Sequence, residues 1–207
     1  VREDHSDFIA RGSRLTTEVS QLPLDATLEA LRVAHEHGLA TVVDLDVLPS
    51  DAIKGLGDQP TLNAVLREAD LLKPTTLAAR ELFPEIGSLP DLVSAIRNEY
   101  GISTIVLTDG ENGSLLGDAA GNRWVAAYSI PKVVDSTGAG DAFFGGFLAG
   151  EALGLDLEAA AKLGNACGAA CVEQMGAFPE AADALRERAL ELYDGPEPSH
   201  QLWKELT

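Results

Sequence analysis

The sequence predicts an α/β domain of three layers, in which helices cover both faces of a mostly parallel sheet. Three short apolar runs indicate buried strands, at residues 39–45 (LATVVDL), 70–74 (DLLKP) and 103–107 (STIVL). Strands that are covered on both faces carry apolar residues almost without a break. Segments with helical periodicity separate these runs, and such alternation is typical of parallel strands joined by helical crossovers.

The predicted helices follow in chain order. Asp25 caps a helix that places Leu28, Leu31 and Ala34 on one face and ends at Gly38. Further helices are predicted at residues 60–70, at Thr76–Phe83 before Pro84, and from a cap at Ser88 or Asp91 to Gly101.

The pattern changes after Asp109. Two short apolar segments flank a turn in GSLLGDAAGNRWVAAYSI (113–130), which predicts a β-hairpin at the edge of the sheet. Residues 138–193 have a helical pattern throughout. We therefore expect one domain over residues 1–193, followed by a peripheral tail at 194–207 that contains two prolines.

The charge of the chain limits its partners. The 207 residues include 33 acidic and 15 basic side chains, a formal net charge of −18. Such a surface repels nucleic acids and anionic membranes, because both are polyanions. A site for phosphate must then be built locally, from backbone amides or a metal ion.

The two cysteines indicate the redox state of the compartment in which the protein works. Cys167 and Cys171 lie in an alanine-rich helical run without a Cys-x-x-Cys pair, which is typical of small buried side chains in a reducing cytoplasm. The sequence has neither a secretion signal nor an apolar run that could span a bilayer. We expect a cytoplasmic protein, and because the first residue is Val1 we expect the chain to begin part-way into a longer one.

The segment DSTGAGDAFFGGFLAG (135–150) is the strongest candidate for a functional site. Gly138 and Gly140 allow backbone angles that other residues avoid, so successive N–H groups could face one concavity at the start of a helix, where an anion is favoured. Asp141 falls in the first turn. It either stabilises the helix by about 0.3–1 kcal/mol or acts as a base beside the bound anion. Spacing alone leaves both roles open.

Other nucleotide-binding motifs fit poorly. The chain contains no Gly-x-x-x-x-Gly-Lys-Ser/Thr, so it is not a P-loop protein. Phe143 stands where a dinucleotide-binding fingerprint requires its third glycine, and a dehydrogenase-type binder is a minor alternative.

The segment at 135–150 resembles the second signature of the PfkB (ribokinase-like) carbohydrate kinases, Asp-Thr/Ser-x-Gly-Ala-Gly-Asp-x-Phe. Neighbouring features agree in order and spacing: VVDLD, LLKP, IVLTDGENGS, a helix with Asn165, and a turn at Gly176-Ala177. The resemblance extends from about Asp7 to Tyr193. It corresponds to the C-terminal part of such kinases, so the N-terminal part and its lid are expected to be absent from this chain.

The resemblance implies that the γ-phosphate of ATP is transferred to a sugar hydroxyl. It makes Asp141 the general base and the amides of Gly138, Ala139 and Gly140 the anion hole. It also implies a monovalent-cation (K⁺) site at Asp135 and Thr137, and sugar-side carboxylates at Asp44 and Asp46. The nucleotide site that it implies comprises Thr108, Gly110, Gly113, Asn165 and Gly176. Mg²⁺ is expected to arrive with the nucleotide, and the lid of the family often pairs two subunits into a homodimer.

Two departures from the family pattern weaken parts of this interpretation. The family usually carries Pro-Asn-x-x-Glu after the lysine strand, where this chain has Thr75 and Ala78. The strand pattern Asp-x-Asn-x-Arg is here Asp44-Leu45-Asp46 without an arginine, which leaves the sugar undetermined. The alternative is a catalytically silent nucleotide-binding relic. The resemblance also predicts that the isolated chain binds nucleotide weakly, tends to oligomerise and has little kinase activity.

Overall fold

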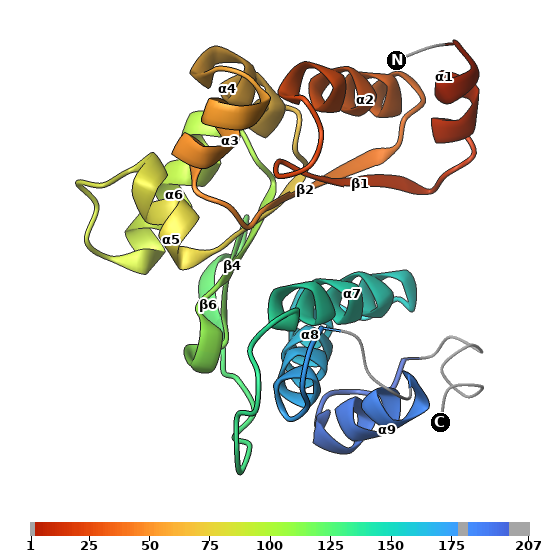
Figure 1. Cartoon of the computed structure of the whole chain (residues 1–207), viewed down its shortest axis with the longest axis vertical. Helices are drawn as coiled ribbons and strands as arrows, with labels where there is room; N and C mark the ends of the chain where they lie inside the picture. Colours follow the sequence, from red (N-terminus) through yellow and green to blue (C-terminus); the bar gives the residue numbers. More distant parts are fainter. Residues whose placement is uncertain (1–2, 178–181, 199–207) are drawn as a thin grey trace. The chain divides into compact units, whose positions relative to one another are not determined.

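A computed structural model describes residues 3–177 and 182–198 of the chain (Figure 1). The chain divides into two compact units. The first unit comprises Val1–Thr108 and Leu115–Arg123, and the second comprises Asp109–Ser114 and Trp124–Thr207. Most of the predicted peripheral tail, residues 199–207, lies outside the described residues.

A six-stranded sheet has its strands in chain order, from β1 to β6. The strands are β1 (Arg14–Glu18), β2 (Ala40–Leu45), β3 (Leu71–Pro74), β4 (Thr104–Thr108), β5 (Ser114–Asp118) and β6 (Gly121–Val125). Strands β1 to β4 pair in parallel, which confirms the predicted parallel sheet. A turn of two residues joins β5 to β6, and β6 ends the strand order, as the predicted edge hairpin requires.

Strand β1 was not predicted from the sequence. It reads RLTTE, and Leu15 is its only apolar residue. Its pairing with β2, from Arg14 opposite Ala40 to Glu18 opposite Asp44, forms the strand where local propensity does not indicate one.

The helices of the first unit are α1 (Glu3–Ile9), α2 (Leu24–Glu36), α3 (Pro49–Leu56), α4 (Gln59–Arg67), α5 (Thr76–Leu82) and α6 (Leu89–Tyr100). One core cluster combines apolar side chains of α2 to α6 with those of β2 to β5, for example Leu31, Leu66 and Ile96 with Val43 and Leu72. These helices therefore cover one face of the sheet. Alternate strand residues supply that face, because successive side chains of a strand point to opposite sides.

Two predictions about helix starts can be compared with the structure. Ser88, not Asp91, caps α6, since its hydroxyl accepts the Asp91 N–H at 3.5 Å. The predicted cap at Asp25 is wrong, because α2 begins one residue earlier, after Pro23, and no side chain caps it. The Asp25 carboxylate instead accepts the N–H of the adjacent Ala26 at 2.8 Å.

The second unit contains a short 3₁₀ turn, η1 (Gly110–Asn112), and the helices α7 (Ala139–Ala152), α8 (Leu157–Val172) and α9 (Ala182–Leu192). Helices α7 and α8 pack closely: a Cβ at Gly146 would lie 2.6 Å from the Cys167 sulfur. Cys171 is fully buried, Cys167 is half-buried, and both are free thiols, as the sequence predicted. Burial raises the pKa of Cys167 to about 11, so its thiol stays protonated at neutral pH.

Within residues 3–177 and 182–198, no helix combines the length and apolar character that crossing a bilayer would require.

Candidate active site

The segment before α7 brings together several of the predicted site residues in the second unit. Gly138 has a φ of +79° and is the N-cap residue of α7. This left-handed conformation favours glycine, because a Cβ would clash with the backbone. A Cβ at Gly138 would also lie 2.6 Å from the Cβ of Ala177. The glycine thus lets the turn into α7 pass close to the segment that follows α8.

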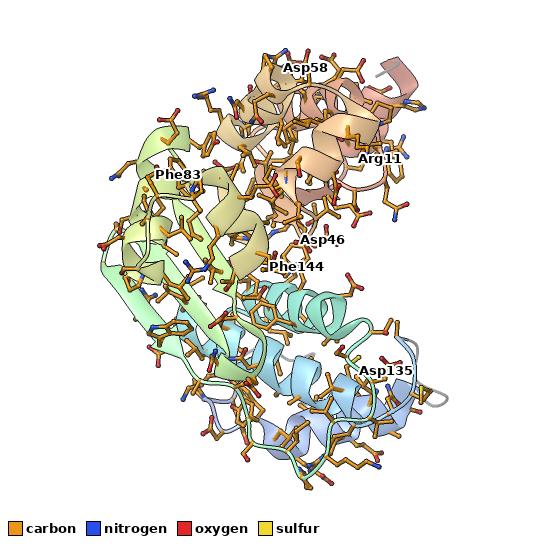
Figure 2. All side chains as sticks on the ribbon, turned by 60° about the vertical axis from the view of Figure 1, so that its left-hand side comes forward. Arg11, Asp46, Asp58, Phe83, Asp135 and Phe144 are labelled. Carbon is orange, nitrogen blue, oxygen red and sulfur yellow. The ribbon has the colours of Figure 1, made fainter. Side chains whose placement is uncertain are left out.

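Asp135 lies before α7 in the second unit (Figure 2), and its carboxylate holds this turn. Its Oδ1 accepts the N–H and the hydroxyl of Thr137 at 3.0 and 2.8 Å, and its Oδ2 accepts the N–H of Gly176 at 2.9 Å. The hydrogen bonds from the Thr137 backbone, the Thr137 hydroxyl and the Gly176 backbone lower the pKa of Asp135 below the usual range of an aspartate. The two predicted cation residues are therefore in direct contact, and one of them also contacts Gly176.

Gly140 does not have the conformation that the sequence suggested. Of the two glycines of the motif, only Gly138 has a positive φ, while Gly140 is the second residue of α7 and is helical. The expectation that Gly140 needs special backbone angles is wrong, because α7 already begins at Ala139. Any requirement for glycine at position 140 must come from the space that a side chain would occupy.

One amide of the predicted anion hole has a partner within the turn. The Ala139 N–H bonds to the Ser136 carbonyl oxygen at 3.2 Å. No side chain of the described residues caps α7, and the N–H groups in the first turn of a helix have no partner within that helix. The start of α7 therefore presents backbone donors and the positive end of the helix dipole, both of which favour an anion.

Asp141 is exposed and lies in the first turn of α7. Phe143, Phe144 and Phe147 follow it and are buried, so the helix is held by its apolar residues while the carboxylate stays accessible. A carboxylate beside a row of N–H donors can accept a proton from a hydroxyl that approaches a bound phosphate.

The segment 109–113 forms a tight turn in the second unit. The Asp109 N–H bonds to the Gly113 carbonyl oxygen at 2.9 Å, and both Gly110 and Gly113 have positive φ, +53° and +99°. A Cβ at Gly113 would collide with the backbone of Val125 and Ala127. Glycine is thus required at this turn. In the first unit, Thr108 ends β4, and its carbonyl oxygen accepts the Thr76 hydroxyl at 3.1 Å.

Asn165 lies buried on α8, and its amide nitrogen donates to the carbonyl oxygens of Val125 and Ala126, both at 3.1 Å. The side chain therefore holds the segment that follows β6. This explains a buried polar residue on an otherwise alanine-rich helix.

The sugar-side candidates lie at the end of β2 in the first unit. Asp44 faces away from the core cluster, between Val43 and Leu45, and both of its oxygens accept hydrogen bonds from Lys73 Nζ at 2.8 and 2.9 Å. Lys73 is opposite Asp44 in the pairing of β2 with β3, and both side chains are buried. Asp46 follows the strand and is exposed (Figure 2).

Lys73 is a site candidate that the sequence analysis missed. The runs VVDLD and LLKP each show one charge within an apolar strand. A buried charge is rarely tolerated without a partner, so two opposite charges on neighbouring strands could have indicated the pair.

The two positions that depart from the family pattern have structural roles here. The Thr75 hydroxyl caps α5 by accepting the Ala78 N–H at 3.2 Å, and the Ala78 side chain is fully buried. Neither residue offers a carboxylate. Among the described residues, no three histidine, cysteine, aspartate or glutamate side chains are grouped so that they could hold a metal ion.

Residues 5–183 match the model of the pfkB family carbohydrate kinases. An uncharacterized sugar kinase of Archaeoglobus fulgidus is 32% identical over 166 residues, which cover 79% of this chain and 61% of that protein. Probable fructokinase-5 of Arabidopsis thaliana is 32% identical over 168 residues, which cover 73% of this chain and 51% of that protein.

Among solved structures, a ribokinase of Arabidopsis thaliana in complex with ribose and ATP matches with a TM-score of 0.77 at 19% identity. The match covers 95% of this chain and 60% of the ribokinase, and it shows that the fold is shared. The ribokinase-like α/β fold that the sequence predicted is thereby confirmed.

The family match over residues 5–183, together with the mostly parallel α/β sheet, places the chain in a class of carbohydrate kinases. The chain belongs to the pfkB family of carbohydrate kinases. It spans 61% and 51% of the lengths of the two curated relatives described above.

Proposed function

We propose that the protein to which this chain belongs transfers the γ-phosphate of ATP to a hydroxyl group of a sugar or sugar acid. The observation that carries the proposal is the start of α7, where Asp141 lies exposed beside backbone N–H groups that no side chain caps within the described residues. Phosphoryl transfer depends chiefly on positioning and on stabilising charge at the phosphate oxygens, and this arrangement supplies both.

Asp141 takes the proton of the acceptor hydroxyl as its oxygen attacks the γ-phosphorus. The bond from that phosphorus to the bridging oxygen breaks, ADP leaves with the bond electrons, and Asp141 later releases its proton to water. The amides of Gly138, Ala139 and Gly140 donate to the oxygens of the transferring group. The Ala139 N–H now donates to the Ser136 carbonyl oxygen, and it would donate to a phosphate oxygen either instead of that bond or in addition to it.

We assign the nucleotide contacts to the glycine turns at Gly110, Gly113 and Gly176, and to Thr108 and Asn165. The positive φ of all three glycines supports this role, because backbone that lacks side chains can approach a ligand closely. On the sugar side we place Asp46, which is exposed after β2, and Asp44, which is fixed by Lys73.

The chain's residues fit a magnesium ion only through the nucleotide, since the described part of the chain groups no three acidic or histidine side chains. Mg²⁺ bound to ATP offsets the charge of the phosphate oxygens. A potassium ion fits Asp135 and Thr137. The Asp135 carboxylate receives three hydrogen bonds, which leaves part of its acceptor capacity available for a cation.

The direct test is sugar-dependent release of ADP by the full-length protein that contains this chain, measured with Mg-ATP and a panel of ketoses, aldoses and sugar acids. We expect at least one acceptor to stimulate ADP release and to gain one phosphate by mass. ATP binding without any acceptor-dependent turnover would instead support the nucleotide-binding relic.

The relic remains as a second candidate because of Thr75 and Ala78. A helix cap and a buried methyl group occupy the positions where the family usually has Asn and Glu. If these positions limit turnover, the variant Thr75→Asn should raise the rate at subsaturating Mg²⁺ and keep the cap of α5, since asparagine is also a good N-cap residue. An unchanged Mg²⁺ dependence would remove this argument for the relic.

A further inference from the structure

A salt bridge joins α9 to the end of α8 in the second unit. Arg188 Nε donates to Glu173 Oε2 at 2.6 Å and Arg188 Nη2 donates to Glu173 Oε1 at 3.3 Å, while Nη1 contacts Glu191 Oε2 at 3.1 Å. This is a two-point contact between a planar guanidinium group and a carboxylate, which fixes direction as well as distance. These bonds raise the pKa of Arg188, so the residue is charged at every relevant pH.

Glu173 is the first residue after α8, and it opens the segment that leads to the candidate site. It is the C-cap residue of α8, and the segment continues through Gly176 to Ala177. The Gly176 N–H bonds to Asp135, and Ala177 lies against Gly138. The segment 173–177 is thus held by Arg188 at its start and by Asp135 near its end.

Backbone hydrogen bonds also join the end of α8 to the segment before α7, because the Val172 carbonyl oxygen accepts the N–H groups of Val134 and Asp135 at 2.7 and 3.4 Å. Met175 is 74% exposed, and the Gln174 N–H makes one backbone bond to the Cys171 carbonyl oxygen at 3.3 Å. Without the bond to Arg188, the Glu173 side chain would lose its direct link to α9, and the start of the segment would depend on the end of α8 and its backbone bonds to residues 134 and 135.

Helix α9 has an anchor of its own that does not involve Arg188. Leu190 packs on the cluster of Leu153 and Leu163, and Ala189 is buried. The helix can therefore stay folded when the Arg188 side chain is replaced, and the effect of the replacement should be confined to the segment that Glu173 begins.

We propose that Arg188 is a positioning residue, which acts through Glu173 to hold Gly176 and Ala177 against the turn that starts α7. The inference rests on the proposed function in one respect: a misplaced segment should weaken nucleotide binding. The hydrogen bonds of Arg188 within the described residues go to Glu173 and Glu191, neither of which is assigned to bind substrate.

The test compares Arg188→Gln with Arg186→Gln in the full-length protein. Arg186 is a suitable control because it lies on the same helix and, among the described residues, forms its ion pair with Asp183, three positions earlier, at 3.3 Å. We expect Arg188→Gln to raise the KM for ATP about two- to fivefold, the range of a half-exposed ion pair. The KM for the acceptor and the kcat should stay unchanged, and Arg186→Gln should match the unmodified protein.

A second readout is independent of nucleotide: hydrogen exchange of the Gly176 amide. The exchange should become faster in Arg188→Gln, stay unchanged in Arg186→Gln, and be partly restored in Arg188→Lys, which keeps one charged donor for Glu173. If Arg188→Gln fails to fold, Arg188→Lys is compared with Arg186→Gln instead, and the expected changes in Gly176 exchange and in the KM for ATP are smaller.

Equal Gly176 exchange in the two glutamine variants would overturn the inference. Faster exchange together with an unchanged KM for ATP would also overturn it, because the segment would then move without consequence for the site. If the unmodified protein does not bind ATP, the proposed function fails, and the exchange experiment still decides whether Arg188 positions the segment.

Discussion

Asp44 in the first unit and Asp135 in the second each use both carboxylate oxygens, but their donors differ. Asp44 is buried and accepts two bonds from one lysine on the neighbouring strand. Asp135 lies in a more exposed segment and accepts from two backbone N–H groups and a hydroxyl.

The difference shows two ways of stabilising an aspartate side chain in a folded protein. In the sheet, a countercharge offsets the loss of water, and losing either partner leaves a buried charge. At the turn, N–H and hydroxyl dipoles that point at the Asp135 carboxylate stabilise its charge, and water is nearby. Each of these hydrogen bonds should therefore contribute less to the free energy of unfolding and more to the local geometry of the turn. The first arrangement should therefore govern stability, and the second should govern the position of the site.

The largest expected effect follows from breaking the buried pair. The variant Lys73→Met should lose about 3–5 kcal/mol of unfolding free energy, because the Asp44 carboxylate is left buried without its cation. Urea unfolding measures the loss.

A double variant, Asp44→Leu with Lys73→Met, sharpens this result. It should recover most of the loss, since replacing both charges with apolar groups is often neutral. Equal instability of the single and double variants would mean that packing, rather than charge, decides the stability at this position.

A smaller effect is expected at the turn into α7. The variant Gly138→Ala places a Cβ at a φ of +79° and against Ala177, which should cost about 1–3 kcal/mol and weaken ATP binding. The control is Gly145→Ala in the same helix, where a Cβ meets nothing within 4 Å. Alanine should stabilise that position by about 0.5–1 kcal/mol. A neutral Gly138→Ala would show that the turn tolerates a side chain.

The smallest effect concerns the pH dependence of Asp135. Its pKa is lowered in the folded protein, so its contribution to stability is complete above the pKa of the unfolded chain and is lost as the pH falls through the lower, folded value. We expect Gly176 amide exchange to be unaffected between pH 5 and 8, after correction for the intrinsic rate, and to accelerate only in more acidic solution. Acceleration that begins near pH 5 would contradict the hydrogen-bond pattern.

Apolar patterning and one long motif were sufficient to predict most of the fold. The strands β2, β3 and β4 could be predicted from their nearly unbroken apolar runs, which are typical of strands that are covered on both faces. Strand β1 and helix α3 (Pro49–Leu56) were missed, since RLTTE has one apolar residue and PSDAIKGL spans only eight residues. Both elements depend on packing with residues distant in sequence, which a local pattern does not contain.

The candidate site was predictable at the level of residues but not of conformation. The motif marked Asp141, yet it could not show that α7 begins before Gly140 or that Ser136 accepts the Ala139 N–H. Nor did it indicate that Asp135 bonds to Gly176, 41 residues away in the chain. Backbone geometry and long-range hydrogen bonds depend on how the whole unit folds.

The central claim is that Asp141 is the general base of a phosphoryl transfer whose anion site is the start of α7. It is tested most directly by the variant Asp141→Asn in the full-length protein, with ATP affinity, thermal midpoint and sugar-dependent turnover measured on the same preparation. We predict that the variant folds and binds ATP, and that its turnover falls about 10²–10⁴-fold, the usual contribution of a general base. Turnover close to that of the unmodified protein, with folding and ATP binding intact, would contradict the claim.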